Sequence, residues 1–228
     1  MSLIIDTLSI SYKFLAPHPF DDRLFIKKIE DIFTYKADVL AVNVNDSGHV
    51  TSQPKPIYVA KDGTSELNFT PEIGVIGVRG EEFDKVNSNF NYITKILETD
   101  MEVDFKKDIE YLELLSKGRY KGRNQPLETL NKYHSIEKKT VFNNFFDNED
   151  VLNMEIRVCN ETNLKTRKNI RKLENWFDIK IFPFIINPNF YAYDLVYRKP
   201  NIRDVEIFWS KLEDKIKNLF IGLEREVS

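Results

Sequence analysis

The chain has 228 residues, of which 42% are apolar and 13% aromatic, and its formal net charge is −3. A chain of this length and composition can bury a sizeable core, as one large domain or two small ones. The single cysteine, Cys159, excludes an intrachain disulfide and argues against a cysteine-based metal site. The first twenty residues lack the pattern of a signal peptide, and no stretch is apolar for the length of a membrane span. We therefore expect a cytoplasmic protein without a membrane partner.

Hydrophobic spacing predicts the elements of the first half of the chain. Phe25, Ile29 and Phe33 recur at helical spacing after Asp21 or Asp22, either of which can cap a helix. Asp62-Gly63 is a dipeptide preferred in tight hairpin turns. The expected order is a strand over 8–16, this helix, a strand over 37–46, a loop over 47–56, a hairpin over 57–69, a strand over 73–80, a helix over 81–100 and a strand over 109–118.

The second half repeats this order. The spacing predicts a strand over 151–160, a basic helix over 161–177 and two strands over 178–188 and 190–199. Asn201 follows Pro200 and can cap one long final helix over 201–224. The apolar stripe of that helix comprises Ile202, Val205, Trp209, Leu212, Ile216, Leu219 and Leu223.

These elements predict the fold class. Strands that alternate with helices but include hairpins cannot build a purely parallel sheet. Both halves read strand–helix–strand–strand–helix, so we expect an α+β fold that arose by internal duplication. Its sheet or sheets are antiparallel or mixed, in two ferredoxin-like or related halves with the helices on one face. The predicted parts are an N-terminal half over 1–122, a partly helical linker over 123–149 and a C-terminal half over 150–228, forming one compact unit.

Two segments carry a resemblance to a known family. The first, "YVAKDGTSELNFTPEIGVIGVRGEEFDKVNSNFNYITKI", leads from an aspartate-glycine hairpin through a strand to an amphipathic helix. The second, "YDLVYRKPNIRDVEIFWSKLEDKIKNLF", is a strand followed by a long helix that ends in Phe. In this layout the chain resembles a sporadically distributed prokaryotic protein family of unknown function. It departs from the family's Arg-Tyr-Ile-Asn segment at "EYLELLSKGRY". The resemblance implies a prokaryotic origin but no activity, because the family has none established.

Common catalytic and cofactor motifs are weak in this chain. The glycines of "GVIGVRG" have the spacing G-x-x-G-x-x-G, which is not that of a dinucleotide-binding loop. Glu81 and Glu82 follow at the start of a helix, where they would repel a phosphate. The three histidines, His18, His49 and His134, are far apart and form no metal-binding pattern. We therefore expect no cofactor and no metal.

The strand "FYAYDLVYRK" offers a candidate ligand site. Tyr191, Tyr193 and Tyr197 share one face of it, and Asp194 lies on the other. Glu155 and Arg157, on the first strand of the same half, are candidate neighbours of Asp194. If the aspartate's face is buried, desolvation would raise its pKa and favour a carboxylate-based site. If that face meets solvent, the tyrosines are core packing. Both interpretations stay open at this point.

The segment "SKGRYKGRNQ" and the basic helix predict a second candidate site. The stretch from Lys117 to Lys172 has thirteen basic and seven acidic residues, in a chain that is acidic overall. If the two elements meet, they form a positive surface with a tyrosine free to stack on a base. The alternative is a solvated loop between the halves and a solvated helix face. The candidate nucleic-acid contacts are Lys117, Arg119, Tyr120, Lys121, Arg123, Lys165, Arg167, Lys168, Arg171 and Lys172.

Three functions follow from these sites. We favour a non-catalytic binding or regulatory protein that holds a small apolar or aromatic ligand in a cleft between two halves. The first alternative is a nucleic-acid-associated protein of a defence or mobile-element system, which grips phosphates with the basic loop and helix. The second is an enzyme with a carboxylate-based site around Asp194. Edge strands of the sheet could also pair two chains into a homodimer.

Overall fold

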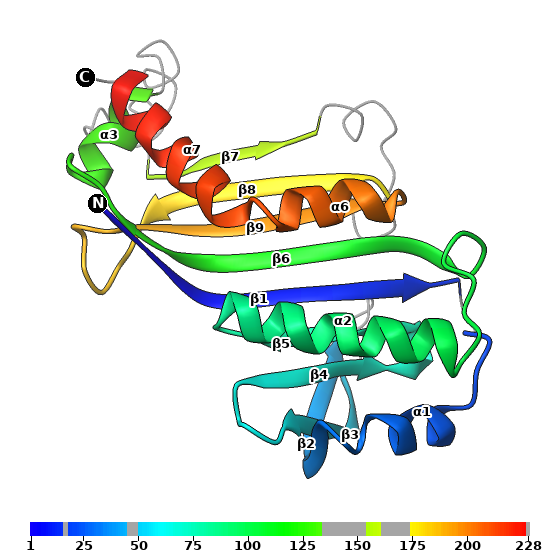
Figure 1. Cartoon of the computed structure of the whole chain (residues 1–228). Coiled ribbons are helices and arrows are strands. Elements are labelled where there is room, and N and C mark those ends of the chain that lie inside the picture. Colours follow the sequence, from blue (N-terminus) through cyan, green and yellow to red (C-terminus); the bar gives the residue numbers. More distant parts are fainter. Residues whose placement is uncertain (16–17, 45–49, 134–153, 161–173, 227–228) are drawn as a thin grey trace. The chain divides into compact units, whose positions relative to one another are not determined.

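The nine described strands form one sheet. The computed structural model describes residues 1–15, 18–44, 50–133, 154–160 and 174–226 (Figure 1). The hydrogen-bonded strand order is β2-β3-β4-β5-β1-β6-β9-β8-β7, and the sheet is antiparallel. The α+β class is confirmed, but the expected pair of ferredoxin-like halves is wrong. The reason is that β2 to β5 follow one another as sequential antiparallel neighbours, so three strands separate β1 from β2, where a ferredoxin-like half has a single strand between two strands that a helix joins.

Contacts divide the chain into two units. One is Leu8–Leu112, and the other combines Met1–Thr7 with Glu113–Ser228. Strands β1 (Ser2–Phe14) and β6 (Ile109–Lys121) therefore each contribute residues to both units. The division expected from sequence, at residues 122 and 149, stays a prediction.

The strands of the first unit form a meander. These are β2 (Phe33–Val44), β3 (Val50–Ala60), β4 (Ser65–Thr70) and β5 (Val75–Gly80), with the short 3-10 helix η1 (Pro71–Ile73) between the last two. The predicted turn at Asp62-Gly63 is confirmed: Gly63 has φ +74°, and the Asp62 carboxylate accepts bonds from the backbone N–H and hydroxyl of Thr64. The loop expected over 47–56 is wrong from residue 50 onward, because β3 pairs with β2 there.

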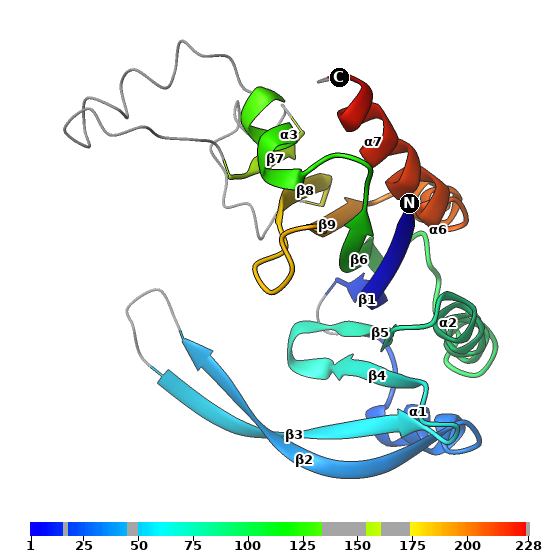
Figure 2. The same ribbon diagram turned by 90° about the vertical axis from the view of Figure 1, so that its left-hand side faces the viewer.

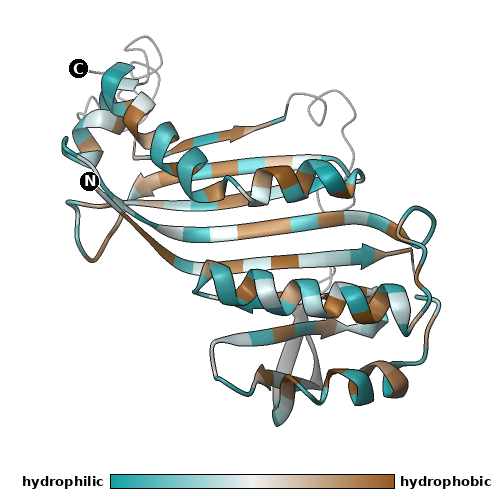
Figure 3. Cartoon of the chain, viewed as in Figure 1, coloured by the Kyte–Doolittle hydropathy of each residue, from teal (hydrophilic) through white to brown (hydrophobic). Residues whose placement is uncertain are grey.

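Two helices complete this unit. Asp21 caps α1 (Asp22–Ile29), which is shorter than expected because Phe33 already belongs to β2. The second helix, α2 (Phe83–Thr99), buries an apolar stripe that includes Val86, Phe90 and Ile93, and Phe90 stacks on Tyr12 of β1 at 4.9 Å between ring centroids. The hydropathy colours in Figure 3 alternate along both helices, as amphipathic helices require.

The second unit packs helices on a smaller group of strands. Its strands besides β1 and β6 are β7 (Ile156–Cys159), β8 (Trp176–Pro183) and β9 (Tyr191–Lys199). The helix α3 (Pro126–Tyr133) lies within the segment that was expected to be a linker. Asn201 caps a helix as predicted, but that helix is the short α6 (Ile202–Trp209). The expected single long helix is wrong, because a separate helix, α7 (Leu212–Glu226), follows. In α7 it is Phe220 that is buried, whereas Leu219 is 39% exposed.

Some predictions fall on residues that the structure does not describe. The strand expected over 151–160 is described only from residue 154, and β7 begins at Ile156. The basic helix expected over 161–177 lies mostly outside the described residues, and its last two residues, Trp176 and Phe177, belong to β8. Among the described helices, none is long and apolar enough to cross a membrane.

Candidate functional site

The basic segment "SKGRYKGRNQ" lies largely in strand β6, which extends to Lys121. Period-two alternation separates its residues onto two faces of the sheet. Ser116 and Tyr120 are buried, with 0% and 1% of their surface exposed. Lys117 and Lys121 alternate with them and are exposed. The interpretation as a solvated loop is therefore wrong up to Lys121, where the exposed residues are cations, and it fits only the exposed residues 123–125 that follow β6.

Close packing against α7 occupies the face of Tyr120 that was expected to stack on a base. Its ring is parallel to that of Phe220, with 4.6 Å between centroids and 5° between planes. Its hydroxyl is buried without a hydrogen-bond partner among the described residues, and burial raises the pKa of Tyr120. The tyrosine is thus a core residue.

The tyrosine face of β9 is core packing as well. Tyr191 and Tyr193 are 0% and 1% exposed, and both rings lie against Phe220. Burial raises the pKa of each to about 12. Tyr197 stacks on Phe208 of α6 at 4.1 Å. These rings are occupied by protein, so a ligand could stack on them only if α6 and α7 moved away.

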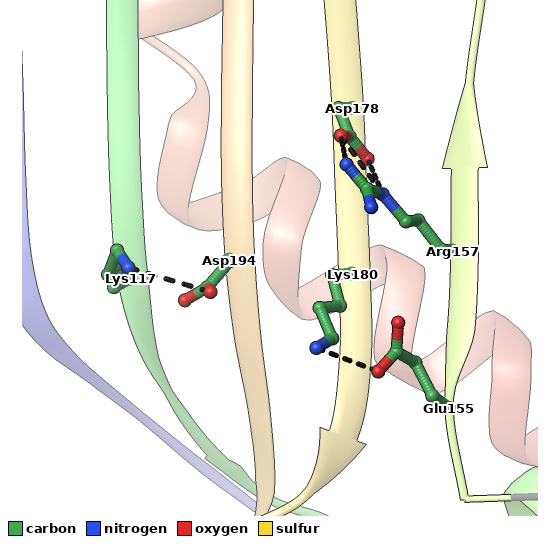
Figure 4. A network of polar contacts seen from close by, with 6 residues as sticks. All are labelled: Lys117, Glu155, Arg157, Asp178, Lys180 and Asp194. Carbon is green, nitrogen blue, oxygen red and sulfur yellow. Dashed lines mark hydrogen bonds and ion pairs between the residues drawn. The ribbon is translucent and has the colours of Figure 1, made fainter. Parts of the chain in front are cut away.

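The opposite side of β6, β9, β8 and β7, here named the charged face, carries a network of ion pairs (Figure 4). It includes the residues that the sequence proposed around Asp194, but not in the expected partnership. Lys117 lies 3.5 Å from Asp194, while Glu155 pairs with Lys180 at 2.7 Å and Arg157 pairs with Asp178 at 2.6 Å. The side chain of Asp194 is 41% exposed, so its face meets solvent.

Two further ion pairs lie on neighbouring positions of the same unit. Arg119 of β6 donates from Nε to Asp6 of β1 at 2.9 Å, and this hydrogen bond raises the pKa of Arg119. Arg198 of β9 pairs with Glu113 of β6. Each carboxylate therefore balances a cation. The charged face offers alternating charge rather than a continuous positive track.

Cations also cover three phenylalanine rings where β8 turns into β9. Such contacts hold a ring and a cation together while leaving part of both accessible. The pairs are Arg119 with Phe184 at 5.1 Å, Lys121 with Phe190 at 5.9 Å and Lys180 with Phe182 at 4.9 Å.

Beyond these rings, the residues between Phe184 and Phe190 form the hairpin tip, the loop that joins β8 to β9 in Figure 1. Phe184 and Phe190 close it with a backbone hydrogen bond of 2.8 Å. Inside, Asn187 donates its N–H to the carbonyl of Phe184, which makes Ile185 and Ile186 the central residues of a tight turn. They are 89% and 85% exposed, more than any other large apolar side chain in the described chain.

Sequence reasoning missed these isoleucines and assigned them to a strand. The signal that could have found them is their position directly before Asn187-Pro188-Asn189, a strong turn sequence. The predicted nucleic-acid contacts Lys165, Arg167, Lys168, Arg171 and Lys172 lie outside the described residues. In the part of the chain that the structure describes, no group of three or more His, Cys, Asp or Glu side chains could hold a metal ion.

Comparison of the chain with known proteins finds no relative. No family model, no curated protein and no solved structure matches the chain. The resemblance to the prokaryotic family of unknown function stays a prediction.

Proposed function

We propose that this chain is a non-catalytic binding protein, and that it docks on a partner protein by inserting the hairpin tip into an apolar pocket. The observation that carries this proposal is the exposure of Ile185 and Ile186, 89% and 85%, at the centre of a turn. Scattered exposed apolar residues are normal on protein surfaces. Two adjacent ones at a protruding tip are a contiguous patch, which is typical of an interaction site.

Local folding preferences give no reason for isoleucine in this turn. Central turn positions favour Gly, Pro, Asn, Asp and Ser, and β-branched residues favour strands. The following turn obeys this rule with Pro188 and Asn189 at its centre. Positions that break a local rule without a gain in packing are expected at functional sites. The isoleucines therefore serve binding rather than folding.

The surroundings of the tip indicate the chemistry of the partner. Lys121 is exposed, forms no ion pair with any described residue, and lies at the base of the tip over Phe190. Arg119 lies beside Phe184. A pocket that accepts both isoleucines and carries carboxylates on its rim complements this arrangement. Burying the two side chains contributes about 3–6 kcal/mol, a factor of about 10² to 10⁴ in affinity.

Two other macromolecular partners fit less well. On the charged face, Asp6, Asp194 and Glu155 would repel phosphates of a nucleic acid, and Tyr120 is buried. A lipid surface would gain the two isoleucines and one unpaired lysine. That is comparable to the marginal membrane binding of a single acyl chain, about 10⁴ M⁻¹. A protein pocket adds hydrogen bonds and complementary shape to the same apolar burial.

The small-ligand and enzyme hypotheses receive no support from described side chains. The tyrosines proposed for the ligand pack on Phe220, and Asp194 is a partly exposed member of an ion pair. Both hypotheses stay predictions.

A crosslinking experiment tests the proposal. A photoreactive amino acid at position 186 should capture one discrete protein in the native cell, whereas the same group at Ile207, a 49% exposed residue of α6, should not. With that protein purified, Ile185→Ser/Ile186→Asn should raise Kd at least 100-fold without loss of thermal stability. Ile207→Ser is the matched control and should leave Kd unchanged.

Three outcomes would overturn it. Crosslinking that is equal at positions 186 and 207 removes the role of the tip. Salt-dependent binding to a labelled 20-mer RNA or DNA in the absence of protein, weakened by Lys117→Ala/Lys121→Ala, replaces the partner by a nucleic acid. Cosedimentation with phosphatidylcholine–phosphatidylglycerol vesicles that depends on the two isoleucines replaces it by a lipid surface.

A further inference from the structure

The β2–β3 hairpin of the other unit has an edge that the proposed function does not use. Strand β3 pairs with β4 only at Tyr58↔Leu67 and Val59↔Glu66. Residues 37–44 of β2 and 50–57 of β3 therefore pair only with each other among the described strands, and form a two-stranded ribbon that runs past β4 (Figure 2). A ribbon of two strands is marginally stable in water, and a third strand stabilises it.

On the β2 side, the residues that lead into this ribbon are exposed on both faces. Residues 34–38 are all exposed, and alternate residues of a strand point to opposite faces. Tyr35, for example, is 55% exposed and contacts only the edge of Tyr58 among described rings. A partner strand therefore meets no described helix on this part of the ribbon.

Two prolines identify which edge of the ribbon is open. Pro54 and Pro56 of β3 lie opposite Leu40 and Asp38 of β2. Proline has no N–H, so within a sheet its nitrogen must face away from the neighbouring strand. Pro54 and Pro56 thus turn to the outer edge of β3 and remove two donors from it. That edge is poorly suited to pairing with another strand.

The positions of Pro54 and Pro56 also determine which backbone groups of β2 point to its outer edge. Residues opposite each other in an antiparallel pair either both face the neighbour or both face away. The outward N–H and C=O groups of β2 are therefore those of Asp38, Leu40, Val42 and Val44. The sequence from 37 to 44, "ADVLAVNV", has no proline or lysine, two residues that block edge pairing, and its one charged residue is Asp38 near the end of the segment.

We propose that the outer edge of β2 pairs antiparallel with β2 of a second copy of this chain. The register that uses every outward group places Leu40 opposite Val42 and Asp38 opposite Val44, with Ala41 opposite Ala41 of the second copy. Four residues in each copy then exchange about eight hydrogen bonds across the interface. The interface is isologous, as in most homodimers.

A second copy is favoured over a foreign strand because it brings an equally open edge of the same length and spacing, which a foreign protein would have to supply independently. Because the four outward residues are evenly spaced, the two-fold axis through Ala41 leaves none of their groups unpaired. The bulge at Lys36, where the register of β2 shifts between Tyr35 and Ala37, ends the regular edge next to this segment. The edge is thus as long as the pairing requires.

Disulfide trapping tests the register. Ala41→Cys in the Cys159→Ser background should form a disulfide-linked dimer under mild oxidation. A non-hydrogen-bonded pair brings Cα atoms to about 4.5 Å, within the range that a disulfide spans. Asn43→Cys in the same background is the control, because in this register its two copies lie about 13 Å apart along the strands. Equal trapping of both variants would overturn the register.

Sedimentation equilibrium of the full chain tests the dimer itself. The unmodified protein should be dimeric at 100 µM, and Val42→Pro should weaken the dimer at least tenfold. This substitution removes an outward donor but leaves the ladder with β3 intact. Val42→Thr, which keeps the N–H and the β-branched shape, should not weaken it. A protein that is monomeric at 100 µM, or a dimer that Val42→Pro does not weaken, overturns the proposal.

Discussion

Gly122 makes room for a buried carboxylate, and this gives the sharpest stability prediction. Glu224 of α7 is 5% exposed and accepts backbone N–H bonds from Arg123 at 2.9 Å and Asn124 at 3.1 Å. The hydroxyl of Tyr191 donates to the same oxygen at 3.4 Å. A Cβ on Gly122 would lie 1.8 Å from that oxygen and 2.7 Å from Cδ. Gly122→Ala must therefore displace the carboxylate.

The expected cost follows from the hydrogen bonds that are lost. A bond to a charged group contributes about 1.5–3 kcal/mol, and the displaced carboxylate also loses part of its compensation for burial. We expect Gly122→Ala to lower the free energy of unfolding by about 3–5 kcal/mol, a large fraction of the stability of a typical domain. Urea unfolding followed by circular dichroism measures it.

A double-mutant cycle separates this cause from a general effect of the substitution. Once Glu224→Ala removes the carboxylate, Gly122→Ala should cost little more, so the coupling energy between the two sites should be about 3 kcal/mol. The control is Gly222→Ala in α7, two residues before Glu224, where an added Cβ meets nothing within 4 Å. Helix propensity predicts a gain of about 1 kcal/mol there. Additive costs at 122 and 224, or a cost below about 1 kcal/mol for Gly122→Ala, would refute the reasoning.

Two further predictions concern the buried tyrosines. Because burial raises the pKa of Tyr191 and Tyr193 to about 12, the unfolded chain, with tyrosine pKa near 10, loses its protons first as pH rises. The contribution of these tyrosines to stability should therefore be constant well below pH 10 and then fall by about 2.3 kcal/mol per tyrosine by pH 12. Tyr193→Phe should reduce that fall in urea titrations, and an unchanged profile contradicts the assignment. Tyr120→Phe removes a buried hydroxyl that has no hydrogen-bond partner among the described residues. The free energy of unfolding should therefore stay unchanged or rise by about 1 kcal/mol. A decrease of more than about 1 kcal/mol would show that the hydroxyl forms a stabilising hydrogen bond.

Local sequence signals predicted the structure correctly where interactions within one short segment determine its conformation. The caps at Asp21 and Asn201 and the turn at Asp62-Gly63 occur where the sequence places them. In each case a side chain bonds to a backbone group within three residues, or a glycine adopts positive φ. These interactions need no distant partner, so composition and spacing predict them.

The wrong predictions concern segments whose conformation depends on residues that are distant in the sequence. The strand β6 continues through "KGRYK" because Gly118 allows a close approach: a Cβ on Gly118 would lie 2.3 Å from the carbonyl of Ile4 and 2.8 Å from Tyr193. Nothing within the segment reveals these neighbours. The strand order, in which β1 pairs with β5 some 65 residues later, overturned the expected halves for the same reason.

For the candidate site, too, some features follow from local sequence and others from tertiary packing. By itself the sequence determined that Asp194 and the tyrosines of β9 occupy opposite faces, because strand alternation is a local property. Only the tertiary structure decided which face is buried, since the packing of Phe220 on Tyr193 depends on where α7 lies. It also decided that Ile185 is exposed, because burial depends on what the rest of the chain brings near a residue.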